Sequence, residues 1–225
     1  MPDLRVISIG ALSVHELWDR PAPPRTAHAT TTLVTAGDKR ILVDPALPAQ
    51  ALVPRLEERA GLAPSDITDV FLTCFRPAHR LGLAAFDTAA WWVAEAEREA
   101  VGAMLVERYK AEPEDSDEAE IYRKEIALLQ RCQAAPDKLA DQVDLFPLPG
   151  FTPGTCGLLL PEPTRTVLIA GDAVPTIEHL QAGRVLRGAY DAELAMESLK
   201  EAIEIADVIV PGHDNVMLNP MGRRS

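Results

Sequence analysis

Residues 70–82 read VFLTCFRPAHRLG, an apolar run that passes straight into a polar turn and then reaches a glycine. The apolar part predicts a strand over residues 68–72, so Cys74 and His79 are expected just beyond the carboxyl end of that strand. Ligands of α/β sheets bind at this end of the strands. The turn is therefore the candidate functional loop; the plain alternative is an ordinary strand-to-helix connection whose histidine packs or caps.

The composition bounds the kind of protein to which this loop belongs. Of the 225 residues, 47% are hydrophobic and 25% are charged, which is typical of a globular protein. A chain of this length fits one large domain that buries roughly 70% of its unfolded surface. No run approaches the ~20 apolar residues of a membrane span, and by Val6 the N-terminus reads as a strand rather than a targeting segment. We expect a cytoplasmic protein with no membrane partner.

The net charge of −12 and the three cysteines argue against nucleic-acid-binding proteins and against disulfide-rich proteins. Binding to nucleic acid needs clustered Lys and Arg residues, which this sequence lacks, so no nucleic-acid partner is expected. Cys74, Cys132 and Cys156 are odd in number and widely spaced. This spacing fits neither a disulfide framework nor a Cys-x-x-Cys metal clip, and a reducing compartment is the simpler interpretation.

Apolar periodicity predicts the other elements. Strands are expected over residues 4–9, 29–35, 40–43, 89–94, 143–148, 157–160, 166–170 and 208–210, and helices over residues 49–62, 95–110, 120–133 and about 191–206. The helical pair reads as one insertion over about residues 95–136. A Pro-rich segment at residues 20–25 is interpreted as a connector or lid edge, and the segment with Glu178, His179 and Arg184 as a loop.

Three strands each end in a turn with a potential metal ligand, namely His79, Asp172 and His213. Two histidines and one carboxylate at different strand ends are a common way to hold a divalent ion with open positions for water or substrate. Each member also has a structural interpretation, because a strand-terminal Asp often caps a turn and an isolated His often packs in a core.

The order of the motifs resembles that of the metallo-β-lactamase superfamily over nearly the whole chain. The matching stretches are ILVDP at 41–45, residues 72–82, PGFTPG at 149–154, AGDA at 170–173 and VPGH at 210–213. The resemblance implies one domain over residues 1–225, an α/β fold with four αββα layers, in which two mixed sheets pack face to face with helices outside. It also implies a two-metal site at one edge of the sheets.

The sequence departs from the family pattern at the ligand positions. The motif His-x-His-x-Asp-His is represented by Cys74, Arg76, Ala78 and His79, and Phe151 replaces the histidine of the Pro-Gly-His-Thr-Pro-Gly loop. Neither Arg nor Phe offers a lone pair to a metal, so the first metal position is expected to be empty. The second keeps His79, Asp172 and His213 and is expected to hold at most one ion of zinc, iron or manganese.

Arg76 and Cys74 take on new roles in this interpretation. Arg76 is expected either to pair with Asp172 in place of a metal and bind an anionic substrate group, or to point into solvent. Cys74 is expected to be a soft fourth ligand or a nucleophile at the site, or alternatively a buried, inert thiol.

Two hypotheses follow. In the first, the protein hydrolyses a small, anionic or ester-like substrate with metal-activated water, Asp172 acts as the base, and Arg76 orients the substrate. In the second, the chain is a non-catalytic, metal-free relative that binds a ligand or partner in the old cleft, with an Arg76–Asp172 ion pair in place of the metal. A homodimer is compatible with both, and the sequence identifies no substrate.

Overall fold

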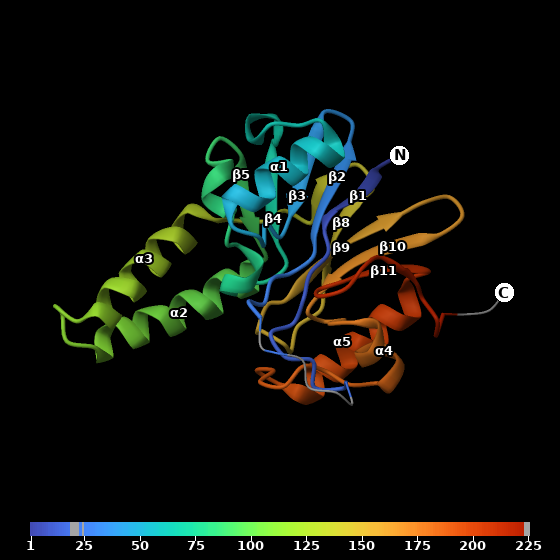
Figure 1. The fold of residues 1–225 in the computed structure, drawn as a ribbon. Coiled ribbons are helices and arrows are strands. Elements are labelled where there is room, and N and C mark those ends of the chain that lie inside the picture. Colours follow the sequence, from blue (N-terminus) through green and yellow to red (C-terminus); the bar gives the residue numbers. More distant parts are fainter. Residues whose placement is uncertain (19–22, 24, 223–225) are drawn as a thin grey trace.

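The computed structural model describes residues 1–18, 23 and 25–222 and contains two six-stranded mixed sheets (Figure 1). The first sheet has the order β1 (Asp3–Ser8), β2 (Thr31–Ala36), β3 (Lys39–Val43), β4 (Asp69–Leu72), β5 (Ala90–Val93), β6 (Gln133–Ala134). Its first three strands are antiparallel neighbours, whereas β3 to β6 are parallel. The carboxyl ends of β3 and β4 therefore lie at the same edge.

The second sheet is mostly antiparallel. Its order is β12 (Met217–Leu218), β11 (Val208–Pro211), β10 (Thr166–Gly171), β9 (Cys156–Pro161), β8 (Val143–Pro147), β7 (Lys138–Ala140). Only β10 and β11 run parallel, so their carboxyl ends also share an edge. These two central strands lead into Asp172 and His213.

The hydrophobic core lies in three layers that correspond to the predicted αββα sandwich. Val34, Ile41 and Phe71 of the first sheet pack against Leu158 and Ile169 of the second. On the outer faces, α1 (Ala49–Ala60) covers the first sheet, whereas α4 (Ile177–Ala182) and α5 (Ala192–Ile205) cover the second. Three short 3₁₀ helices occupy Pro64–Asp66, Pro77–His79 and Leu83–Phe86. The predicted fold class is confirmed.

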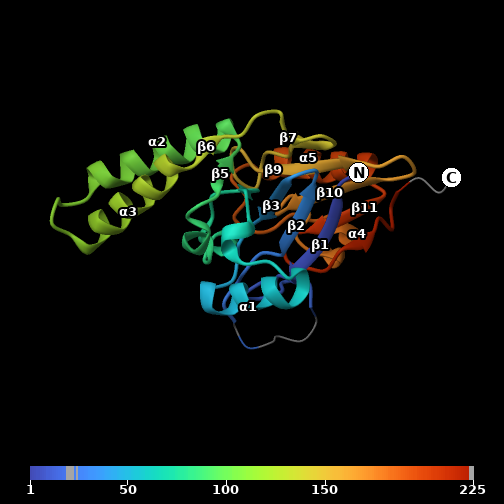
Figure 2. The same cartoon turned by 90° about the horizontal axis from the view of Figure 1, so that it is seen from above.

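The two helices after β5 form a hairpin that projects from the sandwich in both views (Figures 1 and 2). They are α2 (Glu95–Ala111) and α3 (Asp117–Arg131), and the chain then returns to the first sheet as β6. The second helix begins earlier than the predicted residue 120 because the Ser116 hydroxyl accepts a hydrogen bond from the Ala119 amide.

One predicted loop is wrong in part, because Glu178 and His179 lie in α4 rather than in irregular structure. The Thr176 hydroxyl caps the start of this helix, and Gly183 ends it with a φ of 58°. The short strands β6, β7 and β12 were also not predicted, since two or three residues carry almost no periodic signal. Most of the Pro-rich connector at 20–25 lies outside the described residues.

The described helices include none that is long and apolar enough to cross a membrane. Cys74, Cys132 and Cys156 are all buried free thiols.

Candidate metal centre

The carboxyl ends of four strands bring five polar side chains to one edge of the sandwich. Asp44 follows β3, Cys74 and His79 follow β4, Asp172 follows β10, and His213 follows β11. Their side chains are almost completely buried, with residue exposures between 0% and 7%. The sequence predicted all of these residues as site members except Asp44.

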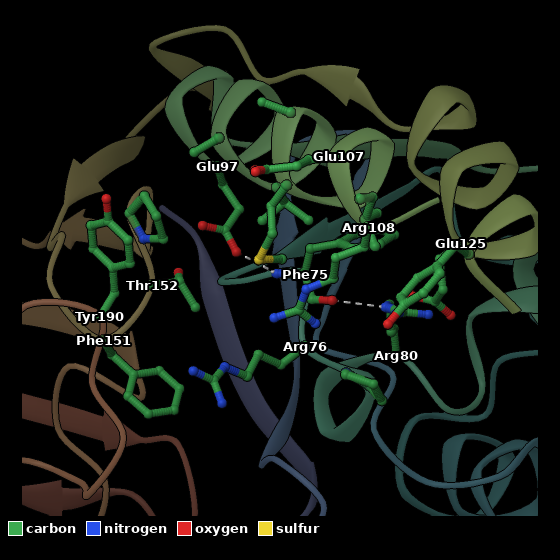
Figure 3. Close-up of a pocket in the computed structure, with 18 of the residues that line it drawn as sticks. Phe75, Arg76, Arg80, Glu97, Glu107, Arg108, Glu125, Phe151, Thr152 and Tyr190 are labelled. Carbon is green, nitrogen blue, oxygen red and sulfur yellow. Dashed lines mark hydrogen bonds and ion pairs between the residues drawn. The ribbon is translucent and has the colours of Figure 1, made fainter. Parts of the chain in front are cut away.

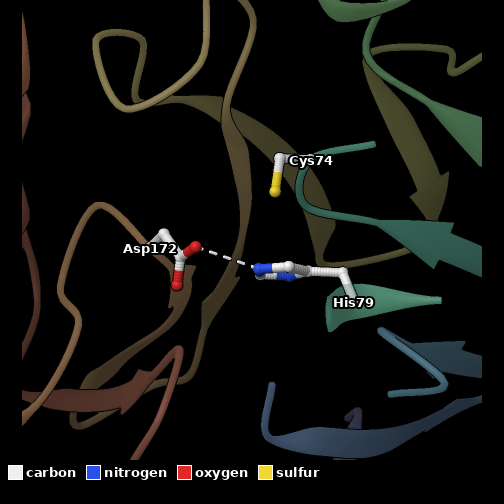
Figure 4. A group of neighbouring side chains, drawn as sticks. All are labelled: Cys74, His79 and Asp172. Carbon is white, nitrogen blue, oxygen red and sulfur yellow. Dashed lines mark hydrogen bonds and ion pairs between the residues drawn. The ribbon is translucent and has the colours of Figure 1, made fainter. Parts of the chain in front are cut away.

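His79 lies between two carboxylates. It ends the short 3₁₀ turn Pro77–His79, whose first residue is a proline with a φ suited to helical geometry. His79 Nε2 lies 3.0 Å from Asp172 Oδ2 (Figure 4), and His79 Nδ1 lies 3.0 Å from Asp44 Oδ2. A hydrogen bond from Nδ1–H to Asp44 would fix the tautomer in which Nε2 offers its lone pair to the site.

Asp44 is the residue that sequence reasoning missed. Its φ of 48° turns the chain sharply at the end of β3, a conformation that aspartate tolerates better than most residues. Its Oδ1 accepts the Thr73 amide at 2.9 Å and its Oδ2 accepts the Thr73 hydroxyl at 2.6 Å. The Val-Asp-Pro sequence after a strand was the available signal, but nothing in it pointed to a contact 35 residues away.

Like His79, His213 is oriented by an acceptor that faces its Nδ1 atom. Its Nδ1 lies 2.9 Å from the His28 carbonyl oxygen, so its Nε2 faces Asp172. The segment after His28 is held to both site loops, because the Ala29 amide donates to Ala78 and the Thr30 amide to Gly212. The backbone thus fixes this histidine's tautomer too.

Asp172 is the shared centre of the two histidines. Its Oδ1 is buried and lies 2.9 Å from His213 Nε2, yet the described residues give this oxygen no hydrogen bond with good geometry. A Cβ at Gly212 would lie 2.4 Å from the same oxygen, which explains the glycine before His213. A buried carboxylate oxygen without a donor is compatible with a cation at this place. The two histidines approach different oxygens of Asp172, and the donors close enough together to share one ion are Cys74, His79 and Asp172, without His213.

Cys74 points toward the space between His79 and Asp172 (Figure 4). Its Sγ, an imidazole nitrogen of His79 and a carboxylate oxygen of Asp172 all lie within 4.8 Å of one another. Burial raises the pKa of the Cys74 thiol to about 11, although His79 opposes the shift. Without a metal the thiol is therefore protonated, and a free thiolate nucleophile is not favoured.

Charges in the cluster shift the pKa values of His79 and Asp172 in opposite directions. Burial alone would lower the pKa of His79, but its interactions with Cys74, Asp172 and Asp44 raise it well above the ordinary range. Burial would raise the pKa of Asp172, but His79 and His213 lower it far below its usual value. In the absence of a metal, the two histidines therefore stabilise the ionised form of Asp172.

Comparison with known proteins identifies the fold family. A model of the metallo-β-lactamase superfamily matches residues 25–213. The chain belongs to the metallo-β-lactamase superfamily. A search of curated proteins gave no match.

Three solved structures share the fold at low identity. A Thermotoga maritima protein named for the metallo-β-lactamases is 20% identical with a TM-score of 0.68, covering 96% of this chain and 99% of its own. The dizinc quorum-quenching lactonase AidC, in complex with the product N-hexanoyl-L-homoserine, is 21% identical with a TM-score of 0.63, covering 78% and 67%. A mutant of AiiA from B. thuringiensis, with N-decanoyl-L-homoserine at the active site, is 21% identical with a TM-score of 0.62, covering 89% and 86%.

Arg76, which the family resemblance places at an expected ligand position, does not contact Asp172. Its side chain is exposed, its Cζ lies 4.4 Å from the centre of the Phe151 ring, and its one hydrogen bond is a 3.4 Å contact to the Gly188 carbonyl. The expected Arg76–Asp172 ion pair is therefore wrong. A pairing across the site would require burial of the guanidinium, whereas stacking on Phe151 keeps it hydrated.

A buried glutamate ties this loop to the neighbouring one. Glu97, in the first turn of α2, is completely buried, and its two oxygens accept the Phe75 amide at 2.9 Å and the Gly154 amide at 3.0 Å. The sequence suggested only that acidic residues favour this helix start, so the role of Glu97 was missed. No periodic pattern distinguishes it from exposed Glu95.

A cavity of about 930 Å³ lies beside the cluster, between the α2–α3 hairpin and the loops that carry Arg76 and Phe151 (Figure 3). Phe75, Arg76 and Phe151 line it, but none of the buried donor residues does. The cavity and the donor cluster thus lie on two sides of one loop.

Proposed function

We propose that this protein is a hydrolase of the metallo-β-lactamase fold that holds a single divalent ion with His79, Asp172 and His213. The observation that carries the proposal is the convergence of both Nε2 atoms on one carboxylate, with each outer nitrogen facing an acceptor. Metal-binding histidines are held in this way by carboxylates and carbonyl oxygens. Cys74 Sγ is close enough to be a further donor, and a donor set of imidazole and sulfur favours zinc over iron or manganese.

A bound ion would supply Lewis acidity, which lowers the pKa of water and polarises a scissile carbonyl. Asp172 keeps its carboxylate ionised, because His79 and His213 hold its pKa far below the usual value, and this suits it as a metal ligand. The two histidines orient the centre through Asp44 and the His28 carbonyl. Arg76, on the cavity side of the loop, orients the substrate rather than neutralising Asp172.

We expect a small-molecule substrate, and the cavity lined by Arg76 and Phe151 is the nearest space on the other side of the site loop. Two proteins of similar fold have N-hexanoyl- or N-decanoyl-L-homoserine bound, and one of them is a quorum-quenching lactonase, so N-acyl-homoserine lactones are the first compounds to test. Esters with an acyl chain of similar length form the second group.

The burial of the donors supports a second candidate function, a metal-free relative that binds ligands without catalysis. Asp44, His79, Asp172 and His213 already satisfy most of their charge and hydrogen-bonding capacity with one another. In this version the imidazolium of His79, not Arg76, takes the place of the metal.

Hydrolysis assays separate the two candidates. Zinc-loaded protein should hydrolyse at least one acyl lactone or ester, and both chelation and Asp172→Asn should abolish the rate. Asp38→Asn, an exposed carboxylate in the β2–β3 turn, is the matched control and should leave the rate unchanged. If the loaded and stripped proteins were equally inactive on the panel, the non-catalytic candidate would stand.

A further inference from the structure

A second cluster of titratable side chains joins the N-terminal part of the chain to the start of α4. Residues 11–18, which we call the strap, supply one half of it and α4 supplies the other. The members are His15, Glu16, Trp18, Thr176, Glu178 and His179. The side chain of His15 is 5% exposed and that of His179 is completely buried. The proposed function uses none of these side chains.

His15 accepts a hydrogen bond from the strap and donates one to α4. The Leu17 amide donates to His15 Nδ1 at 3.4 Å, so the hydrogen of the neutral ring is on Nε2. This Nε2 atom lies 3.2 Å from Thr176 Oγ1 and 3.3 Å from Glu178 Oε2. The Trp18 ring stacks on the imidazole with 4.5 Å between the ring centres, and its Nε1 donates to Glu178. Neutral His15 therefore satisfies both of its ring nitrogens in this contact.

His179 continues the same chain of hydrogen bonds. Thr176 Oγ1 lies 2.9 Å from His179 Nδ1. Because this oxygen accepts from His15, its own hydrogen can donate to His179 Nδ1. The other ring nitrogen, Nε2, faces Glu16 Oε1 at 3.5 Å, and no described residue gives it a hydrogen bond. The chain of contacts thus leaves the strap at His15 and returns to it at Glu16.

A second hydrogen on either ring would face a donor rather than an acceptor. On His15 it would point at the Leu17 amide, and on His179 it would point at the Thr176 hydroxyl. The two ring centres are only 5.2 Å apart, so two imidazolium ions would also repel each other. The geometry of the cluster therefore favours neutral histidines.

The charged neighbours of the two rings are already engaged. Glu16 pairs with Arg187, and Glu178 accepts from Trp18. Arg25 lies over the Trp18 ring, 5.9 Å from its centre, and adds positive charge near His15. Burial lowers the pKa of His179 below the ordinary 6.5, although Glu16 opposes the shift. These neighbours therefore compensate little for protonation of the histidines.

Both halves of the cluster also hold the backbone around His213. On the strap side, the His28 carbonyl oxygen accepts from the Ala11 amide at 2.8 Å and from His213 Nδ1 at 2.9 Å. On the α4 side, the Pro175 carbonyl oxygen accepts from the His213 amide at 2.8 Å. Release of the strap would therefore loosen the carbonyl that orients the His213 ring.

We propose that His15, Thr176 and His179 form an acid-sensitive latch, which holds the strap against α4 and keeps His213 oriented at neutral pH, and which opens when the histidines are protonated. The latch contributes fully above pH 6.5, the ordinary histidine pKa, and weakens as the pH falls below this value, because the latched state resists the proton that the open state binds. The latch itself requires no metal, and only its effect on the site rests on the proposed function.

Hydrogen exchange measured by mass spectrometry tests the latch on the full, chelated chain, with labelling times scaled to the intrinsic exchange rate at each pH. The strap should be protected at about pH 7.5 and should lose at least about tenfold in protection at about pH 5.5. Peptides from α5 should keep their protection at both pH values, which separates opening of the latch from global unfolding.

Three variants at the latch and one control assign the effect. His179→Asn cannot titrate but still offers an acceptor to Thr176, so the strap should stay protected at about pH 5.5. Thr176→Val removes the hydroxyl between the rings and should release the strap even at about pH 7.5, whereas Thr176→Ser should restore protection. Thr164→Val, exposed in the β9–β10 turn, is the matched control and should behave like the wild type.

Zinc affinity at about pH 7.5, measured by competition with a chelator, tests the link to the site. Thr176→Val should weaken zinc binding by at least about tenfold, whereas Thr164→Val should not. An unchanged affinity in Thr176→Val would overturn the link between the latch and His213.

The latch itself would be overturned by equal strap protection at both pH values in the wild type, by the same acid-induced loss in His179→Asn, or by full protection in Thr176→Val. Protein that binds no zinc in any form would refute the proposed function instead, and the exchange experiment on chelated protein would still decide the latch.

Discussion

The buried imidazole of His79 contacts a carboxylate with each of its two nitrogens. Asp172 lies on the side of the candidate metal, and Asp44 lies on the outer side. The sequence motifs predicted His79 and Asp172, because a histidine and an aspartate at these two strand ends are distinctive. Asp44 could not be predicted as their partner, since the contact depends on how β3 and β4 align.

Asp44→Asn tests the outer contact. An amide nitrogen placed where Oδ2 now accepts from Thr73 and His79 cannot accept those hydrogen bonds, so His79 should lose its fixed orientation. Zinc affinity, measured by competition with a chromophoric chelator, should fall by about 10–100-fold. Asp38→Asn serves as the control, and an unchanged affinity in Asp44→Asn would contradict the assigned role.

Arg76→Ala tests the corrected position of the arginine. Because Arg76 is exposed and does not pair with Asp172, the free energy of unfolding in urea should change by no more than about 0.5 kcal/mol. Loss of a buried ion pair would instead cost about 3–5 kcal/mol. Arg80→Ala provides the contrast: Arg80 is buried, donates to the Phe75 carbonyl and pairs with Glu125, so this variant should be clearly less stable.

At the scale of elements, Glu97 joins the start of α2 to two site loops. Glu97→Gln should lower the free energy of unfolding by about 1–3 kcal/mol, because an amide cannot accept from both Phe75 and Gly154. The matched variant Glu99→Gln, exposed on the same helix, should be neutral in urea unfolding. Equal stability of the two variants would show that the loops do not depend on Glu97.

The centre of the first sheet contains a pH-sensitive cross-strand contact. Burial would raise the pKa of Asp69 on β4, but hydrogen bonds from Thr68, Lys39 and Trp92 lower it below the ordinary 3.8. The carboxylate therefore stabilises the fold above pH 3.8, and this contribution is lost as the pH falls through the folded-state pKa.

Asp69→Asn should therefore be less stable than the wild type at pH 7, by about 1–3 kcal/mol, and the difference should shrink toward pH 3. Urea unfolding at several pH values measures both quantities. A difference that does not depend on pH would contradict the lowered pKa.

The elements themselves were largely predictable, because long periodic stretches such as α5 and the β9–β10 hairpin carry their own signal. The exceptions have local causes. The helix α4 has only six residues, several of them polar, so its sequence shows no clear apolar periodicity. The strand β6 forms because it pairs with β5, and its own two residues carry no strand signal.

For the whole molecule, the order of strand-end motifs was sufficient to predict the four-layer fold. The same order predicted the convergence of His79, Asp172 and His213, since their strands end at one edge. It did not predict that Arg76 would turn away from Asp172 toward Phe151, nor that the cavity would form against the α2–α3 hairpin. Both depend on side-chain packing between distant segments, which a linear pattern does not encode.

The proposed function requires that the position formed by His79, Asp172 and His213 holds one ion. Elemental analysis of protein purified without chelators tests it most directly, with His79→Ala measured in parallel and Asp38→Asn as the control. We expect close to one equivalent of zinc in the wild type and the control, and almost none in His79→Ala. Wild-type protein without metal, or equal metal content in wild type and His79→Ala, would contradict it.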